Sequence, residues 1–217
     1  MRIGLIHAVA VAVAPIEEAF QRLWPDPELA NLLDDRLSVD RARNDDLSPA
    51  MFTRIRRLAD YTTELGADAI LYTCSAFGEA IEAVASEKSI PVLKPNEAMF
   101  EAALAQGNRI AMLATFERSV ASMEHEFLGL AKSRGSSATI ETLCVPEAMA
   151  ALQAGDAATH NGLLGQAASG LAPCDAIMLA QFSTSIASPA VGAAVSCPVL
   201  TSPESAVLKL KSLLRQK

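Results

Sequence analysis

The sequence has few of the residues that build metal centres and disulfide frameworks. Among 217 residues there are three histidines and four cysteines, with no CxxC or HxxxH spacing. Zinc sites in proteins are built from such pairs, so we expect no bound metal. Four scattered cysteines do not form a disulfide framework in a chain of this length, and they fit a reducing, cytoplasmic environment best.

Basic clusters and long apolar runs are missing as well. Eighteen Lys and Arg against twenty-five Asp and Glu give a net charge of −7. Without a basic patch we expect no nucleic-acid partner, and no run approaches the ~20 apolar residues of a membrane span. Residues 1–14 superficially resemble a secretory signal, but a similar segment lies in mid-chain, so we interpret them as part of the fold.

The chain repeats itself. Residues 2–6 (RIGLI) resemble 109–113 (RIAML), 68–71 (DAIL) resemble 175–178 (DAIM), and 90–93 (IPVL) resemble 197–200 (CPVL). All three pairs are 107 residues apart. A constant offset predicts two copies of one unit. The alternative is a single α/β domain in which the strands resemble one another by coincidence.

Each copy alternates short apolar runs with amphipathic segments. The runs at residues 3–6, 69–72 and 110–114 suit strands that are buried on both faces of a parallel sheet. Between them, a Ser-Pro start and a glycine end predict a helix over residues 48–66, and an apolar stripe closed by glycine predicts another over 120–135. The alternation indicates right-handed crossovers between parallel strands.

We therefore predict an α/β fold with two pseudo-symmetric lobes, each a parallel sheet flanked by helices. The first lobe covers residues 1–98, with a C-terminal helix at 206–217 packing back on it, and the second covers 99–205. The active-site cleft is expected between the lobes, at the carboxyl ends of the strands. Residues 22–46 fit this scheme least: we expect a strand at 37–39, and otherwise a surface loop, a lid or a subunit contact.

The third strand of each copy ends in chemically informative residues. Cys74 and Gln181 are equivalent under the repeat, and each lies where a buried strand turns into a helix. A helix start binds carboxylates and lowers the pKa of a thiol. Ser75 and Ser183 add hydroxyl groups beside them. We predict a functional role for Cys74, whereas the other three cysteines are interpreted as packing residues.

The internal repeat, the Thr-Cys-Ser at residues 73–75 and the Leu-Ala-Gln-Phe-Ser at 179–183 resemble the aspartate/glutamate/hydantoin racemase superfamily. That group includes maleate isomerases and arylmalonate decarboxylases. The resemblance covers residues 2–208. It implies two pseudo-symmetric lobes, no cofactor, a bound small carboxylate substrate, and a homodimer or homotetramer. It also implies two cysteines, one from each lobe, which exchange protons on opposite faces of the substrate carbon.

The sequence departs from that pattern at one position. Cys74 matches the cysteine of the first lobe, but Gln181 occupies the place of the second, and an amide cannot act as a general acid or base. Arylmalonate decarboxylases also use one cysteine, but theirs is in the second lobe, so this chain has the mirror arrangement. The two-base racemase mechanism is therefore in doubt.

Further residues complete the expected site. Thr115 resembles the family's hydroxyl that holds a carboxylate, although it could instead cap a helix that starts near Glu117. His7 ends the first strand and could be a polar contact, a second proton carrier or a structural residue. The predicted catalytic residue is Cys74, and the predicted substrate-binding residues are His7, Ser75, Ala76, Thr115, Phe116, Gln181, Phe182 and Ser183. Phe77 is expected with Phe116 and Phe182 around the substrate side chain, and Glu97 and Glu204 are expected to cap helices.

These features predict a cofactor-independent racemase or isomerase that acts at the carbon next to a carboxylate, with Cys74 as acid and base. A decarboxylase that uses a single cysteine is the alternative. Isomerisation of a double bond, with Cys74 as a nucleophile, is also open. A small-carboxylate binding protein without catalytic activity is the alternative from another class.

Overall fold

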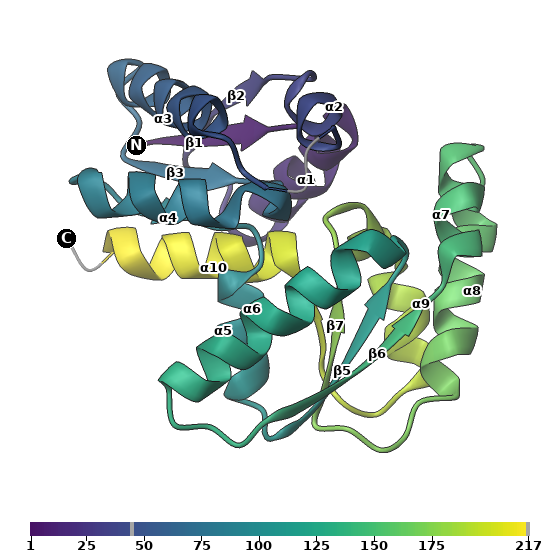
Figure 1. Ribbon diagram of the computed structural model, residues 1–217. Helices are drawn as coiled ribbons and strands as arrows, with labels where there is room; N and C mark the ends of the chain where they lie inside the picture. Colours follow the sequence, from purple (N-terminus) through teal and green to yellow (C-terminus); the bar gives the residue numbers. More distant parts are fainter. Residues whose placement is uncertain (44–45, 216–217) are drawn as a thin grey trace. The chain divides into compact units, whose positions relative to one another are not determined.

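The computed structural model describes residues 1–43 and 46–215, and it divides into two compact units, shown in Figure 1. Unit 1 comprises Met1–Asn96 and Ala206–Lys217, and unit 2 comprises Glu97–Ser205. Each unit contains a four-stranded parallel sheet covered by helices. The predicted fold class, two parallel sheets flanked by helices, is confirmed.

Unit 1 has the strand order β2-β1-β3-β4. Its strands are β1 (Arg2–His7), β2 (Glu28–Leu33), β3 (Ala69–Tyr72) and β4 (Val92–Leu93). Its helices are α1 (Val13–Leu23), α2 (Leu37–Arg41), α3 (Pro49–Glu64), α4 (Gly78–Glu87) and most of α10 (Ser202–Arg215), with short 3-10 turns η1 (Ala10–Ala12) and η2 (Ser75–Phe77). Residues 216–217 of the predicted C-terminal helix lie outside the described residues.

Unit 2 has the strand order β6-β5-β7-β8. Its strands are β5 (Arg109–Ala114), β6 (Thr139–Cys144), β7 (Ala176–Leu179) and β8 (Val199–Thr201). Its helices are α5 (Glu97–Leu104), α6 (Val120–Ser133), α7 (Pro146–Gln153), α8 (Ala157–Ser169) and α9 (Ser188–Ala194), with 3-10 turns η3 (Glu117–Ser119) and η4 (Ser183–Ala187). Glu97 and Glu204 both lie in the first turns of their helices, where a carboxylate stabilises the helix dipole.

The same order of elements occurs twice. Ile3 pairs with Ala69 in unit 1, and the residues 107 positions later, Ile110 and Ala176, pair in unit 2. The backbone N–H of Arg2 donates to Asp68 Oδ2 (2.7 Å), and the same bond recurs between Arg109 and Asp175 (2.9 Å). The repeat read from the sequence is therefore a repeat of strand register and of side-chain contacts.

Alternate side chains of the central strands pack into the core on opposite faces of each sheet. In unit 2, Met112 and Met178 pack into one core cluster with Phe127 of α6. Leu113 and Leu179 pack into a second cluster, which includes residues of α8. Successive side chains of a strand point to opposite faces, so a sheet covered by helices on both sides needs a continuous apolar run. Burying each of these large side chains contributes about 1.5–3 kcal/mol.

Helices α3 and α6 lie where the sequence predicts them, whereas α10 begins at Ser202, four residues before the predicted start at residue 206. The Ser48 hydroxyl accepts from the backbone N–H of Met51 (3.3 Å), and Pro49 is the first residue of α3. Gly66 follows this helix with φ +78°, and Gly135 follows α6 with φ +67°. Both glycines adopt the left-handed conformation that ends helices and that other residues rarely adopt.

The prediction for residues 22–46 places the strand in the wrong segment. Residues 37–39 belong to helix α2, and the strand is β2, which pairs with β1 from Arg2–Glu28 to His7–Leu33. Glu28 follows Arg2 by 26 residues, whereas Thr139 follows Arg109 by 30, so the outer strands of the two units do not share the 107-residue offset. Residues 24–27 join α1 to β2 as an irregular connection, as predicted, and residues 44–45 lie outside the described residues.

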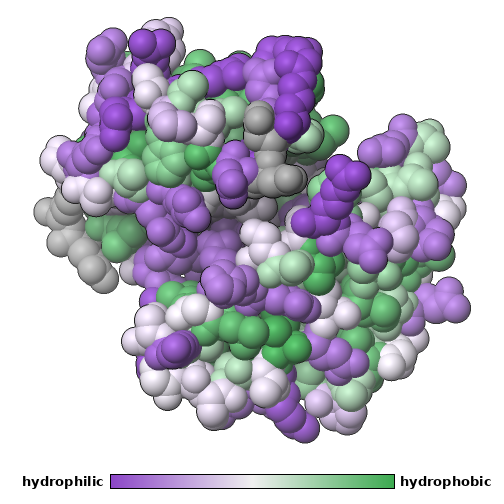
Figure 2. Space-filling view, in the orientation of Figure 1, coloured by the Kyte–Doolittle hydropathy of each residue, from purple (hydrophilic) through white to green (hydrophobic). Residues whose placement is uncertain are grey.

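Hydrophilic and hydrophobic residues are interspersed over the face of the molecule shown in Figure 2. Across residues 1–43 and 46–215, no helix has the length and hydropathy that crossing a bilayer would require.

Candidate functional site

Cys74 lies immediately beyond the carboxyl end of β3. Thr73 and Cys74 continue the extended chain, which then turns through η2 into α4. The backbone N–H of Ala76 donates a hydrogen bond to the Cys74 thiol. Cys74 is partly exposed, as is Ser75, and Ala76 is exposed. The turn therefore places one thiol and one hydroxyl at the end of a buried strand.

The protonation of Cys74 differs from the prediction. Burial raises the pKa of the Cys74 thiol above its ordinary value, and the hydrogen bond from Ala76 only partly offsets this effect. The expectation that the helix start lowers this pKa is therefore wrong. The reason is that η2 has three residues and supplies one N–H donor, whereas the apolar core of unit 1 packs against Cys74.

His7, at the end of β1, is completely buried and connects to Thr73. Its Nδ1 lies 2.9 Å from the Thr73 hydroxyl, and its Nε2 lies 2.9 Å from Asn31 Oδ1. The Asn31 amide group donates in turn to Glu17 Oε1 (2.6 Å). A row of side chains thus runs from the surface at Glu17 to the residue before Cys74.

The partners of His7 determine its tautomer. A carboxylate accepts hydrogen bonds only, so Asn31 turns its NH₂ toward Glu17 and its carbonyl oxygen toward His7. Nε2 of His7 then carries the proton, and Nδ1 accepts from the hydroxyl of Thr73. Burial lowers the pKa of His7, against the raising effects of Asn31 and Glu17, so the neutral ring is favoured.

Arg41 of α2 contacts the turn that follows Cys74. Its Nε donates to the carbonyl oxygen of Ala76 (3.1 Å). Helix α2 is itself held by Arg54 of α3, which binds Asp34 (2.7 Å) and Asp40 (2.7 Å). Helix α2, where the sequence prediction was wrong, therefore supports the turn that follows the candidate catalytic residue.

Gln181, the equivalent of Cys74 in unit 2, has an unusual backbone. Its φ is +65°, the one positive φ of a residue other than glycine among the described residues. The equivalent Cys74 is extended, with φ −128°. A left-handed backbone costs about 1–2 kcal/mol for an ordinary residue, and such conformations concentrate at functional sites.

The side chain of Gln181 joins the ends of β7 and β5. The backbone N–H and the hydroxyl of Thr115 both donate to Gln181 Oε1 (3.3 and 3.4 Å), and Gln181 Nε2 donates to the Ser119 hydroxyl (2.7 Å). Thr115 does not cap a helix, because Phe116 occupies the N-cap position of η3 without a side-chain bond. Thr115 and Gln181, predicted independently as site residues, are thus brought into contact.

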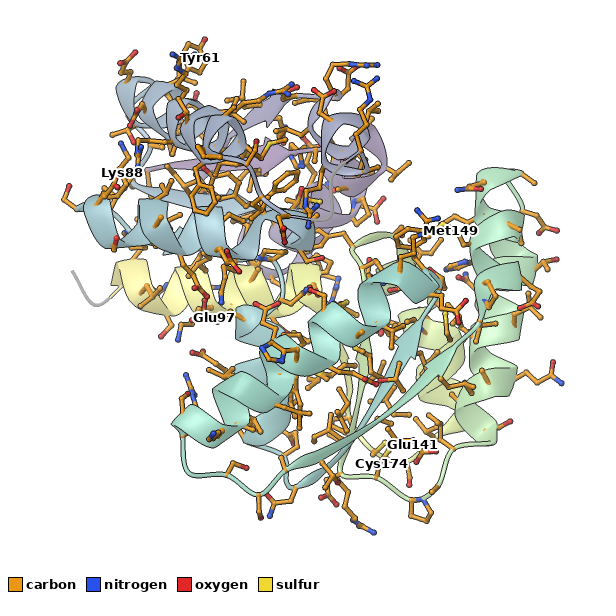
Figure 3. The ribbon with its side chains drawn as sticks, viewed as in Figure 1. Tyr61, Lys88, Glu97, Glu141, Met149 and Cys174 are labelled. Carbon is orange, nitrogen blue, oxygen red and sulfur yellow. The ribbon has the colours of Figure 1, made fainter. Side chains whose placement is uncertain are left out.

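A pocket of about 340 Å³ adjoins Thr115 in unit 2. It is lined by Thr115, Phe116, Glu117, Arg118, Pro146, Met149, Ala150 and Gln153. Phe116 is half exposed beside it, and Figure 3 labels Met149 of α7. Phe77, in contrast, packs into the core of unit 1, and Phe182 is 4% exposed and does not line this pocket.

The predicted residues fall into two groups, one in each unit. His7, Cys74, Ser75 and Ala76 gather in unit 1, and Thr115, Phe116, Gln181, Phe182 and Ser183 in unit 2. Three residues at the site of unit 1 were not predicted: Thr73, which lies inside the Thr-Cys-Ser motif, Asn31 and Arg41. Among the described residues, no group of three or more His, Cys, Asp or Glu could hold a metal ion.

Comparison with known proteins identifies a family over part of the chain. Residues 34–131 match the family model described as Asp/Glu/Hydantoin racemase, which confirms the resemblance read from the sequence. No curated protein matches the chain.

Solved structures share the fold over the whole chain. An allantoin racemase from Pseudomonas fluorescens is 17% identical (TM-score 0.72), covering 100% of this chain and 92% of its own. An aspartate racemase homologue from Pyrococcus horikoshii OT3 is 15% identical (TM-score 0.72) and covers 99% of both. A glutamate racemase from Francisella tularensis, solved with D-glutamate, is 14% identical (TM-score 0.71). The match covers 99% of this chain and 81% of the racemase. At these identities the likeness establishes the fold.

Proposed function

We propose that this chain, whose residues 34–131 match the Asp/Glu/hydantoin racemase family, is a cofactor-independent racemase or isomerase. Its substrate would be a small carboxylate, such as an amino acid, a hydantoin or a related acid, and the reaction would occur at the carbon next to the carboxylate. The observation that carries this proposal is the partly exposed Cys74 thiol at the end of β3, within the matched segment.

Cys74 would exchange a proton with the substrate carbon. As a thiolate it removes the proton, and as a thiol it returns one. Because burial raises its pKa, the thiolate is a stronger base than that of an ordinary cysteine, although less of it is present at neutral pH. The backbone N–H of Ala76 already stabilises negative charge on the sulfur.

The enediolate formed after proton removal needs hydrogen-bond donors. We propose the hydroxyl of Ser75 in unit 1, and Thr115 and Ser183 in unit 2, as these donors. Ala76 is proposed as a binding residue beside them, because its N–H already donates to Cys74. His7 is buried with both ring nitrogens engaged, so it would position the Thr73 hydroxyl rather than contact the substrate directly. Phe116, Gln181 and Phe182 are proposed as further binding residues.

Gln181 favours a second candidate function. Racemisation by two bases requires an acid or base at the position of Gln181, and an amide cannot supply it. A decarboxylase needs a single proton donor, because loss of CO₂ itself generates the carbanion. One thiol at Cys74 would therefore suffice for decarboxylation of a substituted malonate.

One experiment tests both candidates. Wild type and Cys74→Ala are incubated in D₂O with amino acids, hydantoins, hydroxy acids and substituted malonates, and NMR follows deuterium entering the carbon next to the carboxylate. We expect Cys74→Ala to slow exchange by about 10²–10⁴-fold while the substrate still binds. Exchange without loss of CO₂ identifies a racemase, and release of CO₂ with one enantiomer as product identifies a decarboxylase.

A matched control shows whether the loss of exchange is specific to the thiol of Cys74. Cys144→Ala removes a partly exposed thiol from unit 2 and is expected to leave the exchange rate unchanged. Equal exchange rates in wild type and Cys74→Ala would refute the mechanism. Ligand-dependent thermal stabilisation with no exchange in either protein would instead support a non-catalytic carboxylate-binding protein.

A further inference from the structure

Two cysteines of unit 2 lie side by side, away from the residues discussed so far. The sulfur atoms of Cys174 and Cys197 are 3.6 Å apart. Cys174 precedes β7 and Cys197 precedes β8, and these strands are neighbours in the sheet. Gln181 follows β7, so the thiol pair lies at the opposite end of this strand from the candidate site.

Both thiols can be reached from solvent. Cys174 and Cys197 are partly exposed, and their neighbours Pro173, Ser196 and Pro198 are exposed. Figure 3 labels Cys174 at the end of unit 2 where β7 begins. Burial of its side chain and the neighbouring Cys197 together raise the pKa of Cys174 to about 11.

The repeat shows that packing alone does not require this pair. At the equivalent positions of unit 1, 107 residues earlier, the chain has Ala67 and Ile90. Apolar side chains therefore fill the same place in the other copy of the fold. The two thiols occur together in unit 2, where each also contacts an apolar cluster.

We propose that Cys174 and Cys197 are a modification site that reacts with small-molecule disulfides of the oxidised-glutathione class to form a reversible intrachain disulfide. One thiolate attacks a sulfur of the small disulfide and displaces one small thiol, leaving a mixed disulfide on the protein. The second thiolate then attacks the protein sulfur of that bond and displaces the other small thiol. The protein loses two electrons and two protons, and the reagent gains both as two thiols.

The geometry allows this bond. Cys174 and Cys197 each lie two residues before one of the paired strands β7 and β8, and disulfides join Cα atoms about 4.4–6.8 Å apart. The two sulfurs need to approach from 3.6 Å to about 2 Å, which rotation of two partly exposed side chains can supply.

The bond would close a loop around a functional segment. Between the two cysteines the chain forms β7, η4 and α9 and carries Gln181 and Ser183. Closing such a loop restricts the unfolded chain, so oxidation should stabilise unit 2. We expect the Tm of the oxidised protein to rise by about 5–10 °C.

Peptide mapping tests the proposal on the intact wild-type chain. Reduced protein is treated with oxidised glutathione, alkylated, and digested with a protease that cleaves before aspartate. Cys174 then lies in peptide 156–174 and Cys197 in peptide 175–217, whereas Cys74 and Cys144 share peptide 68–155. We expect the first two peptides to be linked, with the loss of two hydrogen masses, and to separate on reduction.

Controls distinguish this bond from general thiol oxidation. Cys174→Ser should leave Cys197 as a glutathione adduct and abolish the rise in Tm, whereas Cys144→Ser should still form the link. Glutathione adducts without a link between peptides 156–174 and 175–217, or unmodified thiols at both positions, would overturn the proposal. The mapping needs no substrate, so its outcome is independent of the proposed catalytic function.

Discussion

At the scale of single residues, His7 at the end of β1 fixes the position of Thr73, the residue before Cys74. His7 has no counterpart of its kind in unit 2, where Ala114 ends the equivalent strand. A buried imidazole is tolerated because Thr73 and Asn31 satisfy both of its nitrogens. The arrangement holds the hydroxyl of Thr73 directly before Cys74.

We predict that Asn31→Ala destabilises the protein by about 0.5–1.5 kcal/mol, because it removes the hydrogen bond between His7 Nε2–H and the exposed Asn31. Urea unfolding followed by circular dichroism measures this loss. Glu17→Ala is the control: it removes the exposed end of the same row and leaves the Asn31–His7 bond in place, so its loss should be smaller. Equal losses in the two variants would contradict the interpretation.

The lowered pKa of His7 predicts a pH dependence of stability. The folded protein binds the proton of His7 less readily than the unfolded chain does, so its stability is fully present above pH 6.5 and declines as pH falls below that value. His7→Gln removes the titrating ring. We expect the free energy of unfolding of wild type to fall more steeply than that of His7→Gln between about pH 7.5 and pH 5.5. Parallel pH profiles would show that His7 contributes nothing.

At the scale of elements, close approach of β1 and α3 depends on a glycine. A Cβ added at Gly4 would clash with Cγ2 of Thr62, whose hydroxyl donates to the carbonyl of Leu58. In unit 2 the equivalent position is Ala111, so the second copy accommodates the methyl group that the first excludes. The two units therefore share a topology but differ in the residue at this position.

We predict that Gly4→Ala destabilises the protein by about 1–3 kcal/mol through overpacking. Adding Thr62→Ser removes the obstructing methyl group while keeping the hydroxyl bond, so the double variant should recover most of the loss. Denaturant unfolding of the two single variants and the double variant measures the coupling. Additive losses, with no recovery, would mean that the strain lies elsewhere.

Sequence patterns predicted the elements unequally well. The apolar runs of β1, β3 and β5 and the capped helix α3 are local signals, and the structure confirms each of them. The edge strand β2 is half exposed and mixes polar with apolar residues, so its period resembles neither a buried strand nor a helix. Only the pairing with β1 in the folded protein identifies this segment as a strand.

At the scale of the whole molecule, the repeat is the dominant feature, and the two copies differ in the residues at the ends of their strands. Equivalent positions hold Cys74 and Gln181, His7 and Ala114, Ala67 and Cys174. Each unit keeps its sheet and its core, while the strand ends diverge. A duplicated scaffold of this kind conserves the buried alternation that stabilises it and leaves the ends of strands free to change function.

The α/β class, the two copies, the central strands and the position of Cys74 could be predicted from the amino-acid order, because apolar runs, helix caps and a constant offset are local patterns. Which side chains meet could not, because it depends on how the chain folds. The tertiary structure brought Asn31 to His7, Thr115 to Gln181 and Cys174 to Cys197, pairs that are 24, 66 and 23 residues apart. It also reversed the expected pKa shift of Cys74, because desolvation depends on what packs around a thiol and not on its neighbours in sequence.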